Sequence, residues 1–260
     1  MPPIIHCVRH AQGFHNLSAE NFVLPDPTLT DLGHAQCRKL QEDFPYHTQI
    51  DLVTASPLHR TIDTALKSFE PVFATHPEMK LIALSDLQET SDLPCDTGTD
   101  PSDLREEYAD KPVNLNLVRE GWNSNTGRYA ATNEAIDERA RDARLWLKAR
   151  PEKEIIVVTH GSLLHYLTQD WEDSTLYHGT GWKNTEWRSY EFVEEIDKYD
   201  LQGRLLEGEN ATVVETLESR KRRGKEGRTL DREQQRILYK RGTQGWSDQY
   251  AAEAEAIAEK

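Results

Sequence analysis

The feature that most constrains the fold of this chain is the segment 155–159, in which every residue is β-branched (Ile155-Ile156-Val157-Val158-Thr159). An unbroken run of this kind is typical of a strand buried on both faces, as in a parallel sheet. His160 and Gly161 follow directly, and a helix with a leucine-rich face is expected behind them. The segment therefore predicts a strand–loop–helix unit of an α/β fold, with polar residues at the carboxyl end of a central strand.

The rest of the first 200 residues repeats this alternation of strands and helices. Thr30 is expected to cap one helix, and Ser56 with Pro57 to start another. Residues 190–193 are expected to form an edge strand. Strands are expected at 4–8, 51–55 and 79–84, and helices at about 31–44 (Leu32, Ala35 and Leu40 inward), 58–69 (Leu58, Ile62, Ala65 and Phe69 inward) and 134–149. This order predicts a three-layer α/β/α sandwich with a mostly parallel central sheet.

Two segments depart from this pattern. Residues 92–128 are polar, rich in Pro and Gly, and are interpreted as a lid-like insertion in a domain that spans residues 1–200. Residues 201–260 are interpreted as a charged, mainly helical C-terminal extension. The basic run 219–225 is interpreted as a solvated, partly disordered face, with a nuclear address or an anion-binding patch as the alternatives.

The net charge of −14 argues against general binding to nucleic acid or membranes. No apolar run is long enough to cross a bilayer, no signal peptide is visible, and Cys7, Cys37 and Cys95 form no zinc motif. A cytoplasmic location, with the nucleus as the alternative, is therefore expected, with no cofactor. Whether the protein is a monomer or a dimer is left open.

Charged residues and histidines follow four of the expected strands: Arg9-His10, Arg60, Glu89 and His160. Because the carboxyl ends of parallel strands meet at one edge of a sheet, we expect these side chains to converge there. An imidazole can attack phosphorus, guanidinium groups can hold phosphate oxygens, and a carboxyl group can protonate the leaving oxygen. The grouping therefore predicts phosphoryl transfer, for which no metal is required.

The electrostatics of such a site lead to two expectations. Neighbouring cations would lower the pKa of His10 and keep it neutral and nucleophilic. A bound dianion would raise the pKa of Glu89 and keep it protonated as a general acid.

Five sequence blocks resemble the histidine phosphatase superfamily, in its phosphoglycerate mutase-like branch. Arg9-His10 resembles the signature dipeptide, with Asn16 matching a further conserved position, and 87–89 resembles the Leu-x-Glu block. The other blocks are 29–36, which resembles Leu-Thr-x-x-Gly-x-x-Gln, 56–65, which resembles Ser-x-Leu-x-Arg-x-x-x-Thr-Ala, and 158–161, with the second histidine and its glycine.

The resemblance implies a phosphoglycerate mutase-like fold and a phosphohistidine on His10. It implies that Glu89 is the proton donor and that Arg60 holds the phosphate together with Arg9 and His160. Asn16, Gly161 and His15 are the further candidates for phosphate or substrate binding. The expected substrate is a small phosphorylated metabolite, and phosphate ion is the expected product.

Departures from the family pattern favour a phosphatase of the fungal and plant mutase-like group, a phosphoric monoester hydrolase (EC 3.1.3.-). Ala11-Gln12 stands where Gly-Glu is usual, and the insertion lacks the paired basic residues with which glycolytic mutases surround their substrate. The alternatives are a phosphoglycerate mutase-type transferase and a catalytically silent phosphate-binding module. A metal site formed by His6, His10 and His15 is a further alternative, although the spacing fits no common ligand motif.

Overall fold

The structure is a computed structural model that describes residues 1–174, 180–194, 198–206 and 208–258, with the backbone alone at 247 and 249–258. The strands are β1 (Ile4–Arg9), β2 (Leu52–Ala55), β3 (Leu81–Leu84), β4 (Val113–Leu117), β5 (Glu154–Thr159), β6 (Trp187–Val193) and β7 (Thr212–Glu215). The α-helices are α1 (Asp31–Asp43), α2 (His59–Ser68), α3 (Glu70–Thr75), α4 (Pro101–Glu107), α5 (Asn133–Lys148), α6 (Gly161–Thr168), α7 (Leu217–Arg222) and α8 (Arg232–Ala258).

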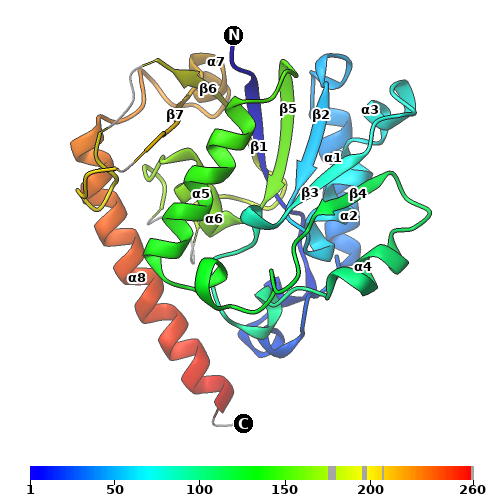
Figure 1. Cartoon of the computed structure of the whole chain (residues 1–260), viewed down its shortest axis with the longest axis horizontal. Coiled ribbons are helices and arrows are strands. Elements are labelled where there is room, and N and C mark those ends of the chain that lie inside the picture. Colours follow the sequence, from blue (N-terminus) through cyan, green and yellow to red (C-terminus); the bar gives the residue numbers. More distant parts are fainter. Residues whose placement is uncertain (175–179, 195–197, 207, 259–260) are drawn as a thin grey trace.

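One sheet organises the described chain, with the strand order β4-β3-β2-β5-β1-β6-β7 (Figure 1). The five strands from β4 to β1 are parallel to their neighbours, and β6 and β7 are antiparallel additions at the far side. The α/β class with a mostly parallel sheet is therefore confirmed. The expectation of an edge strand at 190–193 is wrong, because β7 pairs with the outer side of β6.

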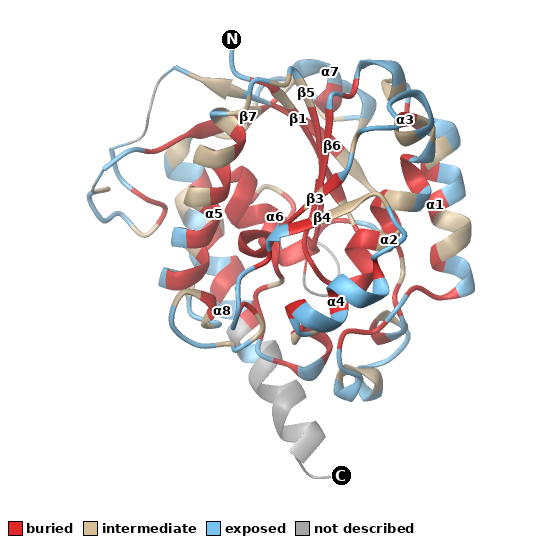
Figure 2. Ribbon diagram, turned by 45° about the vertical axis from the view of Figure 1, so that its right-hand side comes forward, coloured by how far each residue is buried: buried red, intermediate tan, exposed pale blue. Residues whose placement is uncertain are grey.

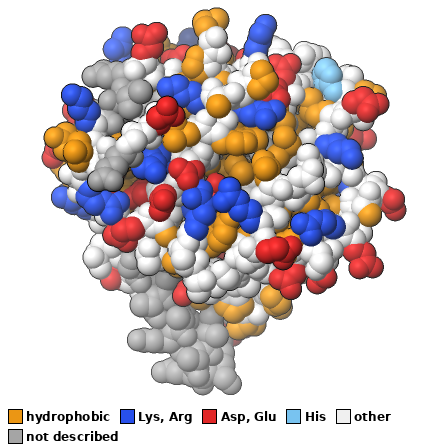
Figure 3. Space-filling model, in the orientation of Figure 1, with side chains coloured by type: hydrophobic (Ala, Val, Ile, Leu, Met, Phe, Trp, Pro, Cys, Tyr) orange, Lys and Arg blue, Asp and Glu red, His pale blue; other side chains and the backbone are white. Residues whose placement is uncertain are grey.

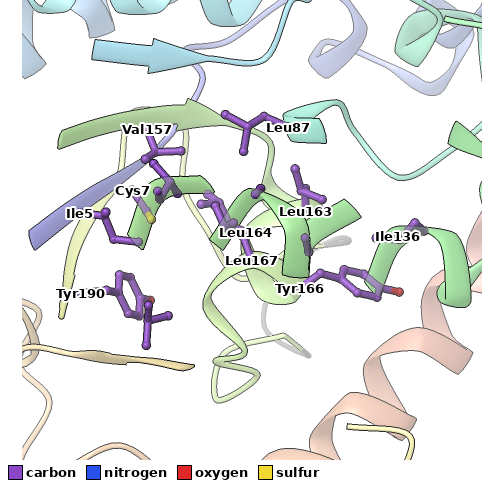
Figure 4. Close-up of a cluster of buried hydrophobic side chains, with 14 of the residues drawn as sticks. Ile5, Cys7, Leu87, Ile136, Val157, Leu163, Leu164, Tyr166, Leu167 and Tyr190 are labelled. Carbon is purple, nitrogen blue, oxygen red and sulfur yellow. The ribbon is translucent and has the colours of Figure 1, made fainter. Parts of the chain in front are cut away.

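Helices cover both faces of the sheet, and the buried residues lie along the strands and the inner sides of the helices (Figure 2). On one face, side chains of β1, β5 and β6 pack against α5 and α6, as the close-up in Figure 4 shows for Cys7, Val157, Leu164 and Tyr190. On the other face, α1 and α2 cover β2 and the alternate residues of β1 and β5. The strand β5 is buried on both faces, as its β-branched run predicts.

Two details of the predicted helices are corrected. Thr30 caps α1 as predicted, accepting a hydrogen bond from the backbone of Gly33, but Leu32 is 54% exposed, and the buried positions are Gly33, Cys37 and Leu40. The predicted start of α2 is also too early, because its N-cap is Leu58. The Ser56 hydroxyl instead contacts the side chain of the residue that follows β5, as described below.

The segment 92–128 is packed into the domain and extends the sheet. It contains α4 and the strand β4, which pairs with β3. Leu104 and Trp122 from this segment lie fully buried in the core cluster with α2. Its irregular sequence pattern reflects short elements joined by turns, so the segment supplies both an edge of the sheet and part of the core.

The boundary expected at residue 200 falls inside the sheet, because β7 comes after it. The interpretation of 219–225 as a solvated face is wrong for three of its cations, since Arg220, Arg223 and Lys225 form ion pairs and Arg220 is buried. Two of their three carboxylate partners, Glu172 and Asp173, come from a distant segment, which is why local composition does not reveal them. The third partner is Glu215.

Charges of both signs are interspersed over the face drawn in Figure 3. Within the described residues, no helix combines the length and apolar character needed to cross a membrane.

Candidate active site

The register of the parallel strands brings the candidate residues together. Arg9 pairs with Thr159 and Ala55 with Val158, so β1, β2 and β5 end at nearly the same level. The backbone N–H of His10 donates to the carbonyl of Thr159 at 2.9 Å, and that of Ser56 donates to the carbonyl of Val158 at 3.0 Å. The residues that follow the three strands therefore meet at one edge of the sheet, as the sequence predicts.

His10 lies buried at the centre of this group, with 2% of its surface exposed. The centroid of its ring lies 5.3 Å from that of His160 and 5.4 Å from that of His15. Nδ1 is 2.7 Å from the carbonyl oxygen of Ala11, an acceptor, so Nδ1 carries the hydrogen. No hydrogen bond from the described residues reaches Nε2, and its lone pair is available for attack.

The three histidines are held in their neutral form. Burial lowers the pKa of His10 well below its usual value, and the charges of Arg60 and Arg9 and the ring of His15 lower it further. Burial and Arg60 lower the pKa values of His15 and His160 in the same way. The site is therefore a buried cluster of neutral imidazoles next to guanidinium groups.

His160 is oriented by Ser56. Its Nε2 lies 2.9 Å from the hydroxyl oxygen of Ser56, whereas its Nδ1 is buried and has no hydrogen-bond partner among the described residues. The Nδ1 of His15 is likewise buried and has no hydrogen-bond partner among the described residues. Unpaired polar atoms of this kind are costly unless a ligand or water contacts them. Two imidazole nitrogens are thus available to an anion beside His10.

The loop that follows β1 is fixed by α1 and α2. The N–H of Ala11 donates to the hydroxyl of Thr64, and that of Gln12 to the side chain of Gln36. Asn16, a predicted phosphate ligand, uses its side-chain oxygen to accept from the N–H of Gly13 at 3.0 Å. The structure therefore gives Asn16 a role in shaping the loop.

Gly33 permits this loop to contact α1, because a Cβ atom there would lie 2.2 Å from the backbone oxygen of Gln12. We expect Gly33→Ala to lower the free energy of unfolding by about 1–3 kcal/mol, measured by urea titration, and to reduce turnover by displacing the His10 loop. Gly245→Ala is the matched control, because a Cβ in that position of α8 would contact nothing within 4 Å. Equal stability of the two variants would contradict the assigned role of Gly33.

Arg9 and Gly161 meet the segment that precedes β6. A guanidinium nitrogen of Arg9 donates to the hydroxyl of Thr180 at 3.3 Å and also to the carbonyl of Trp182. A Cβ on Gly161 would lie 2.6 Å from the Thr180 side chain, so the glycine is required for close approach. Both residues thus join this segment to the strand ends, and Arg9 adds positive charge next to His10 and His15.

Arg60 is buried in the first turn of α2, and its terminal nitrogens are engaged by the insertion. Nη1 donates to the carbonyl of Cys95 at 2.8 Å, and Nη2 donates to Oδ1 of Asp96 at 2.7 Å. Nε is buried without a hydrogen-bond partner among the described residues. Arg60, the predicted phosphate-binding residue, therefore forms an ion pair with Asp96, a carboxylate that the sequence reasoning did not identify.

The carboxyl group of Glu89 lies next to the N-terminal turn of α6. One oxygen of its carboxyl group accepts from the N–H groups of Thr90 at 3.0 Å and Leu163 at 3.1 Å. Burial and the nearby Asp96 raise its pKa to about 7, against the opposing charge of Arg60. A carboxyl group with a pKa near neutrality can give and take a proton at physiological pH.

The position of Glu89 depends on Arg139, a fully buried residue of α5. Its guanidinium donates to the backbone carbonyls of Asp86, Gln88 and Glu89 at distances between 2.8 and 3.2 Å. Sequence reasoning missed Arg139 because it lies on the inward face of an otherwise ordinary amphipathic helix. Ser56 and Asp96 were missed for related reasons: Ser56 fits a helix cap, and Asp96 lies in a segment without periodicity.

The alternative metal site is not supported by the arrangement of the histidines. His6 contacts Ser189 and Glu154, whereas His10 and His15 lie together beyond the end of β1. Across the described part of the chain, no group of three or more His, Cys, Asp or Glu side chains is placed to hold a metal ion.

Comparison with known proteins gives related sequences. The phosphoglycerate mutase-like protein 1 of Arabidopsis thaliana is 30% identical over 200 residues, which cover 63% of this chain and 70% of the relative. A second phosphoglycerate mutase-like protein of Arabidopsis thaliana is 25% identical over 202 residues, with 63% and 72% covered. Both alignments span more than two thirds of the relative.

Similar solved structures include a mycobacterial glucosyl-3-phosphoglycerate phosphatase in complex with vanadate (VO3), with 18% identity, a TM-score of 0.44, and 74% of this chain and 92% of that chain covered. Another is a mutant phosphoserine phosphatase of Entamoeba histolytica in complex with phosphoserine, with 17% identity, a TM-score of 0.46, and coverage of 74% and 92%.

A family model described as histidine phosphatase superfamily (branch 1) matches residues 5–201. The matched range includes His10, Arg60, Glu89 and His160.

Proposed function

The chain belongs to the histidine phosphatase superfamily (branch 1), and from this premise we propose that it hydrolyses small phosphomonoesters through a phosphohistidine on His10. The observation that carries the proposal is the state of His10: a buried, neutral imidazole with Nδ1 tied to a backbone carbonyl and Nε2 unpaired, beside Arg9 and Arg60. This is the form in which an imidazole is a nucleophile, and the two cations favour a dianionic phosphate next to it.

In the first step, Nε2 of His10 attacks phosphorus, a P–N bond forms, and the bond between phosphorus and the ester oxygen breaks. Arg9 and Arg60 stabilise the non-bridging oxygens. In this mechanism His160 carries its hydrogen on Nδ1 and accepts from the Ser56 hydroxyl through Nε2, so that Nδ1 can donate to the same oxygens. Protonated Glu89 gives its proton to the leaving alcohol oxygen.

In the second step, Glu89 acts as a base. It takes a proton from water while the water oxygen attacks phosphorus, the P–N bond breaks, and its electron pair returns to Nε2 of His10. Free phosphate is released, and Glu89 is protonated for the next cycle. No step needs a divalent metal or a cofactor.

A phosphoglycerate mutase-type transferase remains the alternative, since both curated relatives are named mutase-like. The pairing of Arg60 with Asp96 favours hydrolysis, because the carboxylate offsets a charge that a mutase needs to retain a bisphosphate in the site.

The test is a panel of small phosphomonoesters, including p-nitrophenyl phosphate and 3-phosphoglycerate, with EDTA present. We expect release of inorganic phosphate that needs no added 2,3-bisphosphoglycerate. Isomerisation of 3-phosphoglycerate that depends on 2,3-bisphosphoglycerate, without phosphate release, would favour the mutase. Loss of all activity in EDTA, restored by a divalent metal, would contradict the mechanism. Phosphate binding without turnover of any ester would favour a silent binding module.

A further inference from the structure

We propose that Asp96 is a positioning residue that competes with the phosphoryl group for Arg60 and so weakens the binding of phosphate. The inference rests on the proposed function, because it assigns to Asp96 the control of phosphate release in the same site.

The first observation is the way in which Asp96 engages Arg60. Asp96 ends the 3₁₀ helix Pro94–Asp96 and is buried, with 8% of its surface exposed. Its Oδ1 accepts from Nη2 of Arg60 at 2.7 Å, and its Oδ2 accepts from the hydroxyl of Ser91 at 2.5 Å. The ion pair is therefore buried on both sides, where charges are only weakly screened by solvent.

The second observation is that the main chain reinforces this pairing. The carbonyl of Cys95 accepts from Nη1 of Arg60 at 2.8 Å, so both terminal nitrogens of the guanidinium are bound to adjacent residues of the insertion. Phosphate oxygens must share these nitrogens or use Nε, which has no partner among the described residues. Arg60 is thus held in place and partly neutralised before a substrate arrives.

The third observation concerns the groups that face Glu89. Beyond the effect of burial, Asp96 of the insertion raises the pKa of Glu89 and Arg60 of α2 lowers it, while Glu89 itself raises the pKa of the Cys95 thiol. Arg139 of α5 donates to the backbone carbonyl of Glu89 at 3.1 Å. Asp96 is the anion of this set, and with burial it raises the pKa of Glu89 to about 7. Removal of its charge would leave burial to raise this pKa, opposed by Arg60 and by the two backbone N–H groups that donate to Glu89, so the pKa would fall.

These contacts have two consequences for catalysis. Repulsion between the Asp96 carboxylate and a bound dianion weakens the binding of substrate and of product phosphate, and so speeds product release. The same negative charge keeps Glu89 protonated up to a higher pH. Both effects favour hydrolysis with rapid release over retention of a phosphorylated ligand.

The test compares Asp96→Asn with Asp92→Asn. Asparagine can still accept from Arg60 and contact Ser91, so the variant removes the charge with little change in shape. Asp92 is an exposed carboxylate in the same segment, and its replacement controls for net charge. The readouts are the inhibition constant of inorganic phosphate and the pH profile of kcat/KM for an alkyl phosphate.

For Asp96→Asn we expect the inhibition constant of phosphate to fall by about 5- to 10-fold. The pH at which kcat/KM declines on the basic side should move to a lower value by about half a unit or more. Asp92→Asn should change neither. Asp96→Glu, which keeps the charge, should resemble the wild type in both.

Unchanged inhibition and an unchanged basic limb in folded Asp96→Asn would overturn the proposal, and so would shifts of equal size in Asp96→Glu. If Asp96→Asn does not fold, Asp96→Ser is measured in the same way, and failure of both variants to fold would overturn it as well. If the wild type hydrolyses no phosphomonoester, the proposed function fails. Calorimetry of phosphate binding to the wild type and to Asp96→Asn still decides whether Asp96 opposes phosphate at Arg60.

Discussion

Replacement of His10 by alanine should lower kcat for p-nitrophenyl phosphate by at least about 10⁴-fold, because the variant lacks the atom that attacks phosphorus. The other groups of the site would still bind phosphate, so the loss should appear in kcat and not as a failure to bind. The measurement is steady-state hydrolysis by the purified variant, with circular dichroism to establish that it is folded.

His76→Ala is the matched control for this prediction. His76 is exposed at the C-terminal end of α3, away from the strand ends, and its removal should leave kcat unchanged. Activity of folded His10→Ala within about tenfold of the wild type would show that another group is the nucleophile.

The second large effect is expected for Glu89→Gln and should depend on the leaving group. For an alkyl phosphate, whose leaving oxygen needs a proton, we expect kcat/KM to fall by about 10²–10⁴-fold. For p-nitrophenyl phosphate the fall in kcat/KM should be much smaller, because p-nitrophenolate leaves without a proton. The measurement is a plot of log kcat/KM against the pKa of the leaving group.

This plot should be steeper for Glu89→Gln than for the wild type, and equal slopes would contradict the acid role of Glu89.

The acid role of Glu89 also predicts how kcat/KM of the wild type depends on pH. Because Glu89 with a pKa of about 7 donates only when protonated, wild-type kcat/KM for an alkyl phosphate should fall as pH rises through about 7. Glu89→Gln should lack this basic limb.

The mostly parallel character of the sheet could be predicted from the sequence because strong local signals coincide with its central strands. The β-branched run of β5 is buried on both faces, and the apolar spacing of α2 matches its buried face. The strands β4 and β7 were not predicted, because both are short and lie among polar residues. Val213 of β7 is buried in the core cluster with side chains of α6, a contact between residues far apart in the sequence.

The meeting of residues 10, 60, 89 and 160 could be predicted because it follows from parallel strands with aligned ends. The side chains that contact and position these residues could not be predicted. Ser56 fits a helix cap in the sequence, yet its hydroxyl contacts His160. Asp96 and Arg139 are ordinary polar residues until the fold brings one to Arg60 and the other to the backbone around Glu89. Such contacts depend on tertiary distances, for which the sequence carries no local signal.

The central claim, phosphorylation of His10, is tested most directly by mapping the covalent intermediate. Glu89→Gln is suited to this, since p-nitrophenyl phosphate should still phosphorylate it while the attack of water lacks its base. After rapid quenching at alkaline pH and proteolysis, mass spectrometry should find an acid-labile phosphate on His10. Phosphate on His15, on His160 or on no residue, while turnover continues, would contradict the account.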